Sequence, residues 1–405
     1  MSIFQFVAIF SKLEVIFCVF WAENDFVNAL IQFIGIRLNR ESRNGPEVQQ
    51  TGGAALLVAL LFLLVLTGCA SGPSRPRLPA GAELNWPPPP AEARITWTGE
   101  INQPADLGIG KGFWTRIVEL VVGEENTRIV RPYGIYADGE GRIYVTDPGA
   151  ALVHRYDTRQ GRYTRLRGAN GTPLKAPISV SGDGRGTVYV TDAESGMVFR
   201  QTPDDDELLP FITKGLRRPT GLAVDPQGES LYISDSVSDQ VVVFDLAGRE
   251  KFRFGSSGEE PGKFNHPTDL WLDRHGRLLV TDPLNYRIQI FSRAGVYLSG
   301  IAKEAGDATG NFSKPKGVAV DSDGHIYLAD ALLDTIQIFD ERGRLLLAFG
   351  DNGSHPGEFW MPAGIFIGAD DTIYVADAYN YRVQTFRYRH AAGRPAPAPI
   401  QKGSK

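Results

Sequence analysis

One pattern of apolar and polar positions occurs six times along the chain. Each copy has a proline, a short alternating apolar segment, a turn rich in Asp and Gly, a second apolar segment and an aspartate, as in Pro315-KGVAVDSDGHIYLA-Asp330. Alternating apolar and polar residues predict half-buried β-strands, and the Asp/Gly cluster between them predicts a tight turn. The pattern therefore predicts six antiparallel strand pairs.

The spacing of the copies indicates how the pairs assemble. Each aspartate follows its proline by 15 or 16 residues, and successive aspartates lie 43 to 48 residues apart. Two more apolar segments follow each aspartate, for example Thr335-IQIFD and Arg344-LLLAFG. A period of this length with four short strands per unit is typical of β-propeller blades. We therefore predict an all-β, six-bladed propeller with four antiparallel strands in each blade, over residues 94–390.

The two ends of the repeat region suggest how the ring closes. The sixth copy ends near Tyr388 without a fourth strand, and residues 94–101 alternate apolar and polar positions before the first copy. We predict that 94–101 completes blade six, because otherwise two sheet edges would stay open. Residues 111–122 carry apolar residues at helical spacing and predict one short helix before blade one, which either covers a core edge or binds a partner. Residues 391–405 are expected to be a disordered tail.

The later copies carry a recognisable signature. Gly262-Lys-Phe264, Asp282-PLNYRIQI-Phe291 and Asp377-AYNYRVQT-Phe386 resemble the NHL repeat family, and the first three copies depart from this signature. The resemblance implies a six-bladed propeller. Members of that family include binding scaffolds and a few enzymes, and the enzymes on this fold include a peptide-amidating lyase and calcium-dependent lactonases.

A targeting segment precedes the repeats. Residues 54–68 are apolar, and Leu66-Thr67-Gly68-Cys69 resembles the bacterial lipobox. The resemblance implies a signal segment over 54–69, secretion across the inner membrane and lipidation of Cys69. Ser71 resembles the pattern sent to the outer membrane, facing the periplasm. The alternatives are a transmembrane anchor or a buried apolar helix, although the run is short for a span of ~20 residues.

The regions on either side of this segment receive separate predictions. Residues 1–53 form an N-terminal extension, explained either by a biological start nearer Leu38 or by an additional membrane segment. Residues 70–93 are rich in proline, which predicts a semi-rigid tether between membrane and propeller.

Composition narrows the classes of function. The net charge of −5 and the pI near 5.8 argue against general nucleic-acid binding. The two cysteines, Cys18 and Cys69, lie outside the repeats, so the propeller has neither a disulfide framework nor a cysteine-based zinc site. We expect a monomer.

Candidate binding residues gather at one end of the predicted blades. The loops before each repeat proline and after each repeat aspartate share one face, here called the loop face. Five of its residues are basic in a net acidic chain, which favours an anionic small molecule or an envelope protein as partner. The alternative is a solvated rim whose basic residues pair with the repeat aspartates. The candidate residues are Arg131, Tyr133, Arg217, Arg218, His266, Asp269, Lys314, Lys316 and Trp360.

The repeat aspartates are interpreted as structural, although six carboxylates also invite a metal. Each is expected to cap a turn or to pair with an arginine of its blade, such as Arg287 or Arg382. They are Asp147, Asp192, Asp235, Asp282, Asp330 and Asp377. We assign no catalytic residue, metal ligand or cofactor, and leave calcium or zinc in the channel open.

The sequence thus favours an envelope-anchored binding or scaffold module. The alternative is a metal-dependent hydrolase or lyase with its site at the channel mouth. Only His266 and His355 lie on the loop face, whereas a zinc lyase needs several convergent histidines.

Overall fold

A computed structural model of the chain describes residues 83–110, 126–169, 171–203 and 205–390. The predicted N-terminal extension, the signal segment with Cys69, the first part of the tether, the helix at 111–122 and the tail lie outside these residues. Among the residues described, no helix is long and apolar enough to cross a membrane.

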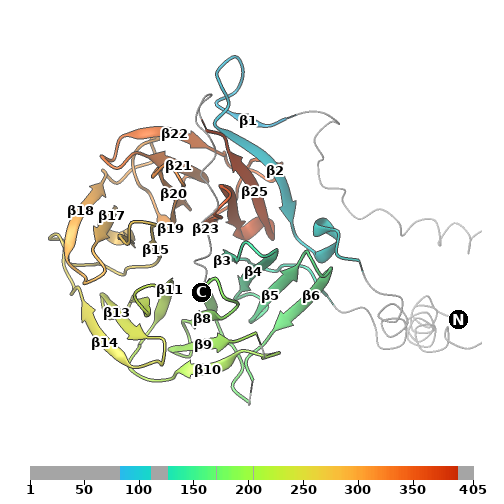
Figure 1. Cartoon of the computed structure of the whole chain (residues 1–405). Helices are drawn as coiled ribbons and strands as arrows, with labels where there is room; N and C mark the ends of the chain where they lie inside the picture. Colours follow the sequence, from blue (N-terminus) through green and yellow to red (C-terminus); the bar gives the residue numbers. More distant parts are fainter. Residues whose placement is uncertain (1–82, 111–125, 170, 204, 391–405) are drawn as a thin grey trace, which may run out of the picture. The chain divides into compact units, whose positions relative to one another are not determined.

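Six antiparallel sheets, five with four strands and one with five, form a ring, which confirms the predicted six-bladed all-β propeller (Figure 1). Blade one consists of β3 (Ile135–Ala137), β4 (Arg142–Asp147), β5 (Leu152–Asp157) and β6 (Arg162–Leu166). Blade two consists of β7 (Pro177–Gly182), β8 (Val188–Asp192), β9 (Met197–Gln201) and β10 (Leu209–Ile212). Blade three consists of β11 (Pro219–Asp225), β12 (Ser230–Asp235), β13 (Gln240–Asp245) and β14 (Glu250–Phe254).

The remaining blades repeat this order from the channel outward. Blade four consists of β15 (Leu270–Leu272), β16 (Leu278–Asp282), β17 (Arg287–Phe291) and β18 (Tyr297–Ala302). Blade five consists of β19 (Pro315–Val320), β20 (Ile326–Asp330), β21 (Thr335–Phe339) and β22 (Leu345–Phe349). Blade six contains β23 (Pro362–Ile367), β24 (Thr372–Asp377) and β25 (Arg382–Tyr388). Within the described ranges, three short 3-10 helices accompany them, η1 (Pro104–Leu107), η2 (Pro283–Asn285) and η3 (Ala378–Asn380).

An N-terminal strand closes the ring, as predicted. The strand β2 (Ile95–Ile101) pairs antiparallel with β25, with Ile95 opposite Tyr388 and Ile101 opposite Val383. Figure 1 shows the blue β2 beside the red β25. Blade six therefore joins both ends of the repeat region in one sheet.

Blade six also has a fifth strand that the sequence did not predict. The two-residue strand β1 (Asn85–Trp86), inside the predicted tether, pairs with the outer side of β2. The Trp86 ring packs against Phe349 of blade five, with ring centres 5.6 Å apart. This strand thereby covers the outer edge of the closing blade.

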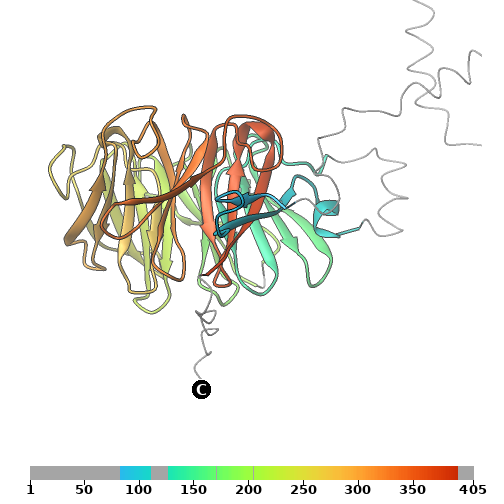
Figure 2. The same ribbon diagram turned by 90° about the horizontal axis from the view of Figure 1, so that it is seen from above.

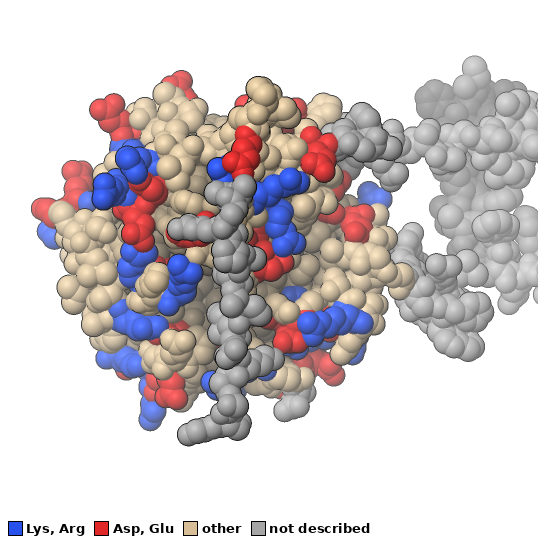
Figure 3. All heavy atoms as spheres, turned by 45° about the horizontal axis from the view of Figure 1, so that its top comes forward, with Lys and Arg blue, Asp and Glu red and all other residues tan. Residues whose placement is uncertain are grey.

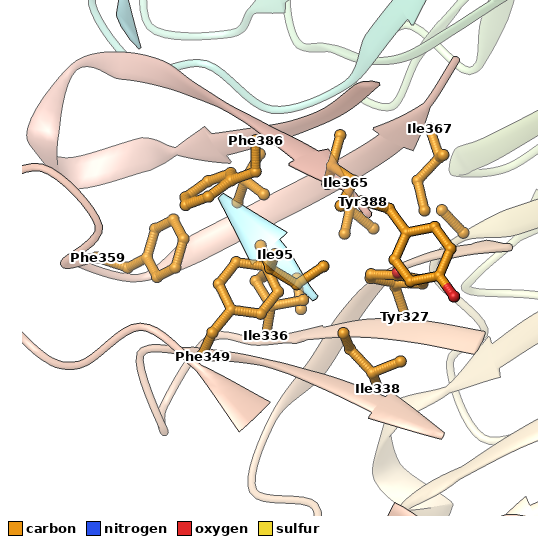
Figure 4. Packing of buried hydrophobic residues seen from close by; sticks show 14 residues of the cluster. Ile95, Tyr327, Ile336, Ile338, Phe349, Phe359, Ile365, Ile367, Phe386 and Tyr388 are labelled. Atoms are coloured by element: carbon orange, nitrogen blue, oxygen red, sulfur yellow. The ribbon is translucent and has the colours of Figure 1, made fainter. Parts of the chain in front are cut away.

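The hydrophobic core lies between neighbouring blades rather than in one central mass. At the closure, Ile95 is fully buried with Phe349, Phe359 and Phe386 (Figure 4). Because each blade buries its faces against its neighbours, each interface between blades contributes to the stability of the ring.

The strands run between two opposite sets of loops (Figure 2). At the loop-face end, the innermost strands approach each other closely at the second residue after each repeat proline. A Cβ on Gly364 would overlap the Tyr133 carbonyl oxygen, and one on Gly317 would lie 2.7 Å from the Ala363 carbonyl oxygen. Glycine at these positions allows the inner strands to pack backbone against backbone.

Candidate functional site

The structure places the candidate residues of the loop face in two environments. Arg131, Arg217, Arg218, His266, Lys314 and Trp360 are exposed on loops at the ends of the blades, while Tyr133 and Lys316 are half-buried near the channel mouth. Asp269 instead lines the channel itself. The face therefore has an exposed rim and an inner polar group.

The repeat aspartates hold the loops of this face in place. Buried Asp235 accepts hydrogen bonds from the backbone amides of Arg217 (2.9 Å) and Arg218 (2.8 Å). Asp330 accepts one from the backbone amide of Lys314 at 2.8 Å, and Asp147 accepts one from that of Arg131 at 3.0 Å. These carboxylates thus bind the backbone of the basic residues and not their side chains.

Other repeat aspartates pair with an arginine of the same blade. Asp282 accepts a hydrogen bond from Arg287 Nε at 2.7 Å, and Asp377 accepts one from Arg382 Nε at 2.8 Å. In blade one, His154 Nε2 lies 3.1 Å from Asp147 Oδ2 and its Nδ1 lies 2.8 Å from the Tyr163 hydroxyl. All three carboxylates are fully buried, so these contacts fix the loops and leave the carboxylates no access to a ligand.

The basic side chains of the rim are consequently free to contact a partner. Within the described part of the chain, the side chains of Arg131, Arg217, Arg218 and Lys314 form no ion pair. Lys316 differs, because its Nζ lies 3.3 Å from the Tyr133 hydroxyl and 5.6 Å from the centre of that ring. This contact joins blades five and one at the channel mouth.

Exposed apolar side chains form the second part of the face. They occupy one repeated position, two residues after the repeat aspartate, in blades three to six. These residues are Val237, Leu284, Leu332 and Tyr379, which are 38%, 54%, 56% and 43% exposed. The sequence reasoning missed them, although their equivalent spacing after each aspartate was a readable signal.

Trp360 extends this apolar arc. Its ring is 50% exposed and packs on Tyr379 with ring centres 5.6 Å apart. In blades one and two the equivalent positions hold Gly149 and Glu194. The apolar arc, defined as Val237, Leu284, Leu332, Tyr379 and Trp360, therefore covers only one side of the loop face.

The distribution of charge outside the loop face is mixed. Figure 3 shows Lys and Arg side chains interspersed with Asp and Glu over the visible surface. Arg142 pairs with Asp138 and Arg277 with Asp273 on the opposite-face turns. The loop face thus differs from these turns, because its basic candidate residues have no ion pair within the described residues and lie on the same face as the apolar arc.

The histidines of the loop face make local contacts. His266 Nδ1 lies 3.0 Å from Asn265 Oδ1, and His355 Nδ1 lies 2.9 Å from Glu358 Oε2. Among the residues that the structure describes, no three His, Cys, Asp or Glu side chains form a group that could hold a metal ion.

Comparison with known families supports the fold. A family model described as a 6-bladed beta-propeller matches residues 320–391. The E3 ubiquitin-protein ligase TRIM32 of Homo sapiens is 46% identical over 43 residues, which are 11% of this chain and 7% of TRIM32. The Mus musculus protein of that name is 44% identical over 43 residues. The chain thus spans less than a tenth of the length of these curated relatives.

Solved structures with the same architecture are distant in sequence. A streptogramin B lyase superposes with a TM-score of 0.50 at 14% identity, covering 64% of this chain and 94% of the lyase. An auxiliary nutrient binding protein from Bacteroides thetaiotaomicron gives a TM-score of 0.52 at 12% identity, covering 65% of this chain and 71% of that protein. At these identities the likeness concerns the fold alone, because one propeller fold carries many activities.

Proposed function

We propose that this six-bladed propeller is a binding module whose loop face recognises an acidic protein segment carrying exposed apolar side chains. The observation that supports this most strongly is the coincidence, on one face, of the apolar arc with basic side chains that have no acidic partner among the described residues. Neither feature alone identifies a partner, whereas together they favour a ligand that is both apolar and anionic.

The two kinds of side chain have different physical roles. Exposed Leu, Tyr and Trp side chains provide apolar area that becomes buried on contact, and the aromatic rings are typical anchors of protein interfaces. Arg217, Arg218 and Lys314 attract an acidic partner at long range and raise its association rate. Both groups lie on loops fixed by buried aspartates, which reduces the entropy lost on binding.

A lipid anchor would hold the protein at a membrane. Leu66-Thr67-Gly68-Cys69 supports the proposal that the mature protein is lipidated at Cys69 and acts in the bacterial cell envelope. Cys69→Ala should then abolish incorporation of a labelled fatty acid and leave the precursor uncleaved, as measured by acyl labelling and mass spectrometry. Normal labelling and cleavage of this variant would contradict the lipid anchor without affecting the proposal for the loop face.

The binding proposal is tested by affinity capture from envelope extract with the full chain. Proteins that bind the wild type should be lost with Arg217→Glu/Arg218→Glu and with Leu284→Ser/Leu332→Ser. Each double variant should weaken binding by roughly tenfold or more, because it removes either the steering charge or the buried contact area.

A matched control uses the opposite-face turns. Arg185 and Arg274 are exposed there, so Arg185→Glu/Arg274→Glu changes the net charge equally without touching the loop face. Capture that is insensitive to both loop-face variants but lost with this control would contradict the proposal.

A further inference from the structure

The inner strands of the six blades enclose a cavity of about 250 Å³ in the central channel. Its lining includes Asp269, Trp271, Phe366 and Tyr136 together with the small residues Ser181 and Ala223. We call this cavity the channel pocket. It is distinct from the apolar arc, whose residues do not line it.

One end of the channel pocket carries a carboxylate where the other blades have almost no side chain. The second residue after the repeat proline is glycine in four blades and Ser179 in blade two, but it is Asp269 in blade four. This layer holds Gly134, Gly221, Gly317 and Gly364, whose inner strands approach closely. The repeat therefore departs from its own pattern to place a negative group inside the channel.

The surroundings of Asp269 compensate its charge poorly. Its Oδ2 accepts a hydrogen bond from the backbone amide of Val318 at 3.0 Å, and the backbone amide of Leu270 also contacts the carboxylate, but within the described residues it has no ion pair. Lys316 borders a smaller cavity of about 20 Å³ beside Asp269, but its ammonium group contacts Tyr133. Burial raises the pKa of Asp269 to about 7. A charged carboxylate in this position is therefore costly to the folded protein.

In blades one to three, the amide of the second residue after the repeat proline donates a hydrogen bond to a Thr or Ser hydroxyl, whereas blades five and six have Ala329 and Ala376 in place of the hydroxyl residue. In blades one and three, the amides of Gly134 and Gly221 donate to the hydroxyls of Thr146 and Ser234 at 2.7 Å. The equivalent hydroxyl in blade four, that of Thr281, is buried and has no hydrogen-bond partner among the residues that the structure describes. The same holds, within that part of the chain, for the hydroxyl of the nearby Thr268. The departure at Asp269 is thus accompanied by two buried hydroxyls that have no hydrogen-bond partner within the described residues.

Aromatic rings form one wall of the channel pocket. The fourth residue after the repeat proline is aromatic in blades one, four and six and small in blades two, three and five. Phe366 contacts both Trp271 and Tyr136, each with ring centres 5.5 Å apart. Ser181, Ala223 and Ala319 occupy the equivalent positions of the other blades, and of these three Ser181 and Ala223 line the channel pocket.

We propose that the channel pocket binds a small organic cation of the substituted-ammonium class. Asp269 would supply the opposite charge, and the rings of Trp271, Phe366 and Tyr136 would supply the cation–π surface that such groups favour. The volume lies below the roughly 300–1,000 Å³ typical of drug-sized ligands, which restricts the ligand to a small molecule.

The proposal is tested by titrating the full chain with choline and with its neutral analogue. In the analogue, a tert-butyl group replaces the trimethylammonium group. Isothermal titration calorimetry at pH 8 should show choline binding at least about tenfold more tightly than the neutral analogue, because only the cation gains the charge and cation–π contacts. Asp269→Asn, which retains an acceptor for the Val318 amide, should abolish this preference. Trp271→Leu should weaken choline binding by about tenfold or more.

Several results would overturn the proposal. They are the absence of choline binding by the wild type up to about 10 mM, equal affinity for choline and the neutral analogue, and an unchanged preference in a folded Asp269→Asn variant. The wild-type comparison needs no substitution, so it remains decisive even where Trp271→Leu impairs folding. Because none of these measurements involves the apolar arc, failure here would leave the proposed function of the loop face intact.

Discussion

Replacing Asp269 by asparagine should change how the stability of the propeller depends on pH. The carboxylate has a pKa of about 7 in the folded protein, against an ordinary value of 3.8, because burial disfavours its charged form. The folded chain therefore holds this proton more tightly than the unfolded chain. Its contribution to the free energy of unfolding is greatest below about pH 4, decreases as the pH rises and is lost above about pH 7.

The size of the effect follows from this difference in pKa. A difference of about 3 units at roughly 1.4 kcal/mol per unit corresponds to about 4 kcal/mol of lost stability between pH 4 and pH 8. This value is an upper limit, since Asp269 borders the channel pocket and water there would solvate its charge. The asparagine side chain cannot ionise, so the Asp269→Asn variant should match the wild type near pH 4 and exceed its stability at pH 8.

Urea denaturation followed by circular dichroism at several pH values measures this difference. Subtracting the wild type from Asp269→Asn removes the contribution of every other group that titrates in the same range. Asp307→Asn is the matched control, because Asp307 is exposed and its substitution should give no pH-dependent difference. A stability difference between Asp269→Asn and the wild type that stays constant from pH 4 to pH 8 would refute the reasoning.

Two further predictions concern the closure of the ring. Ile95→Ala should lower the free energy of unfolding by about 2–4 kcal/mol, because it opens a cavity among buried aromatic rings. Val296→Ala, at an exposed position, is the control and should change the free energy of unfolding by less than about 0.5 kcal/mol. Equal melting temperatures for the two variants would contradict the role of β2. Arg382→Met should lower the free energy of unfolding, measured by thermal or urea denaturation, by about 3–5 kcal/mol, because it leaves the buried Asp377 carboxylate without its arginine. Arg253→Met, which breaks the surface pair with Glu250, should lower it by less than about 1 kcal/mol. Similar losses for both variants would show that the buried pair adds nothing to stability.

The repeat made the architecture predictable. Strand pairs, blade number and the closing strand all follow from a period that is visible in the sequence, and the missing fourth strand of the sixth copy indicated where β2 belongs. The strand β1 could not be predicted in the same way. It has two residues beside a run of prolines, and it forms because Trp86 finds a partner in Phe349, which is distant in sequence.

The functional surface was only partly predictable. The basic residues could be assigned to one face because their positions relative to the repeat prolines are equivalent. Asp269 was grouped with them, but the tight approach of the inner strands places it in the channel, which only the three-dimensional packing shows. The spacing of Leu284 and Leu332 after the repeat aspartates places them on the same face, but their exposure is known only from the structure.

The binding role of the loop face is tested most directly by measuring backbone hydrogen exchange of the full chain. The measurement is made on the chain alone and again with the protein that it captures from envelope extract. The account predicts slower exchange on binding in the loops that carry the apolar arc, at residues 236–239, 283–286, 331–334 and 378–381 and at Trp360. Exchange in the opposite-face turns at 138–141, 183–186 and 273–276 should be unchanged. Protection confined to the opposite-face turns would contradict it.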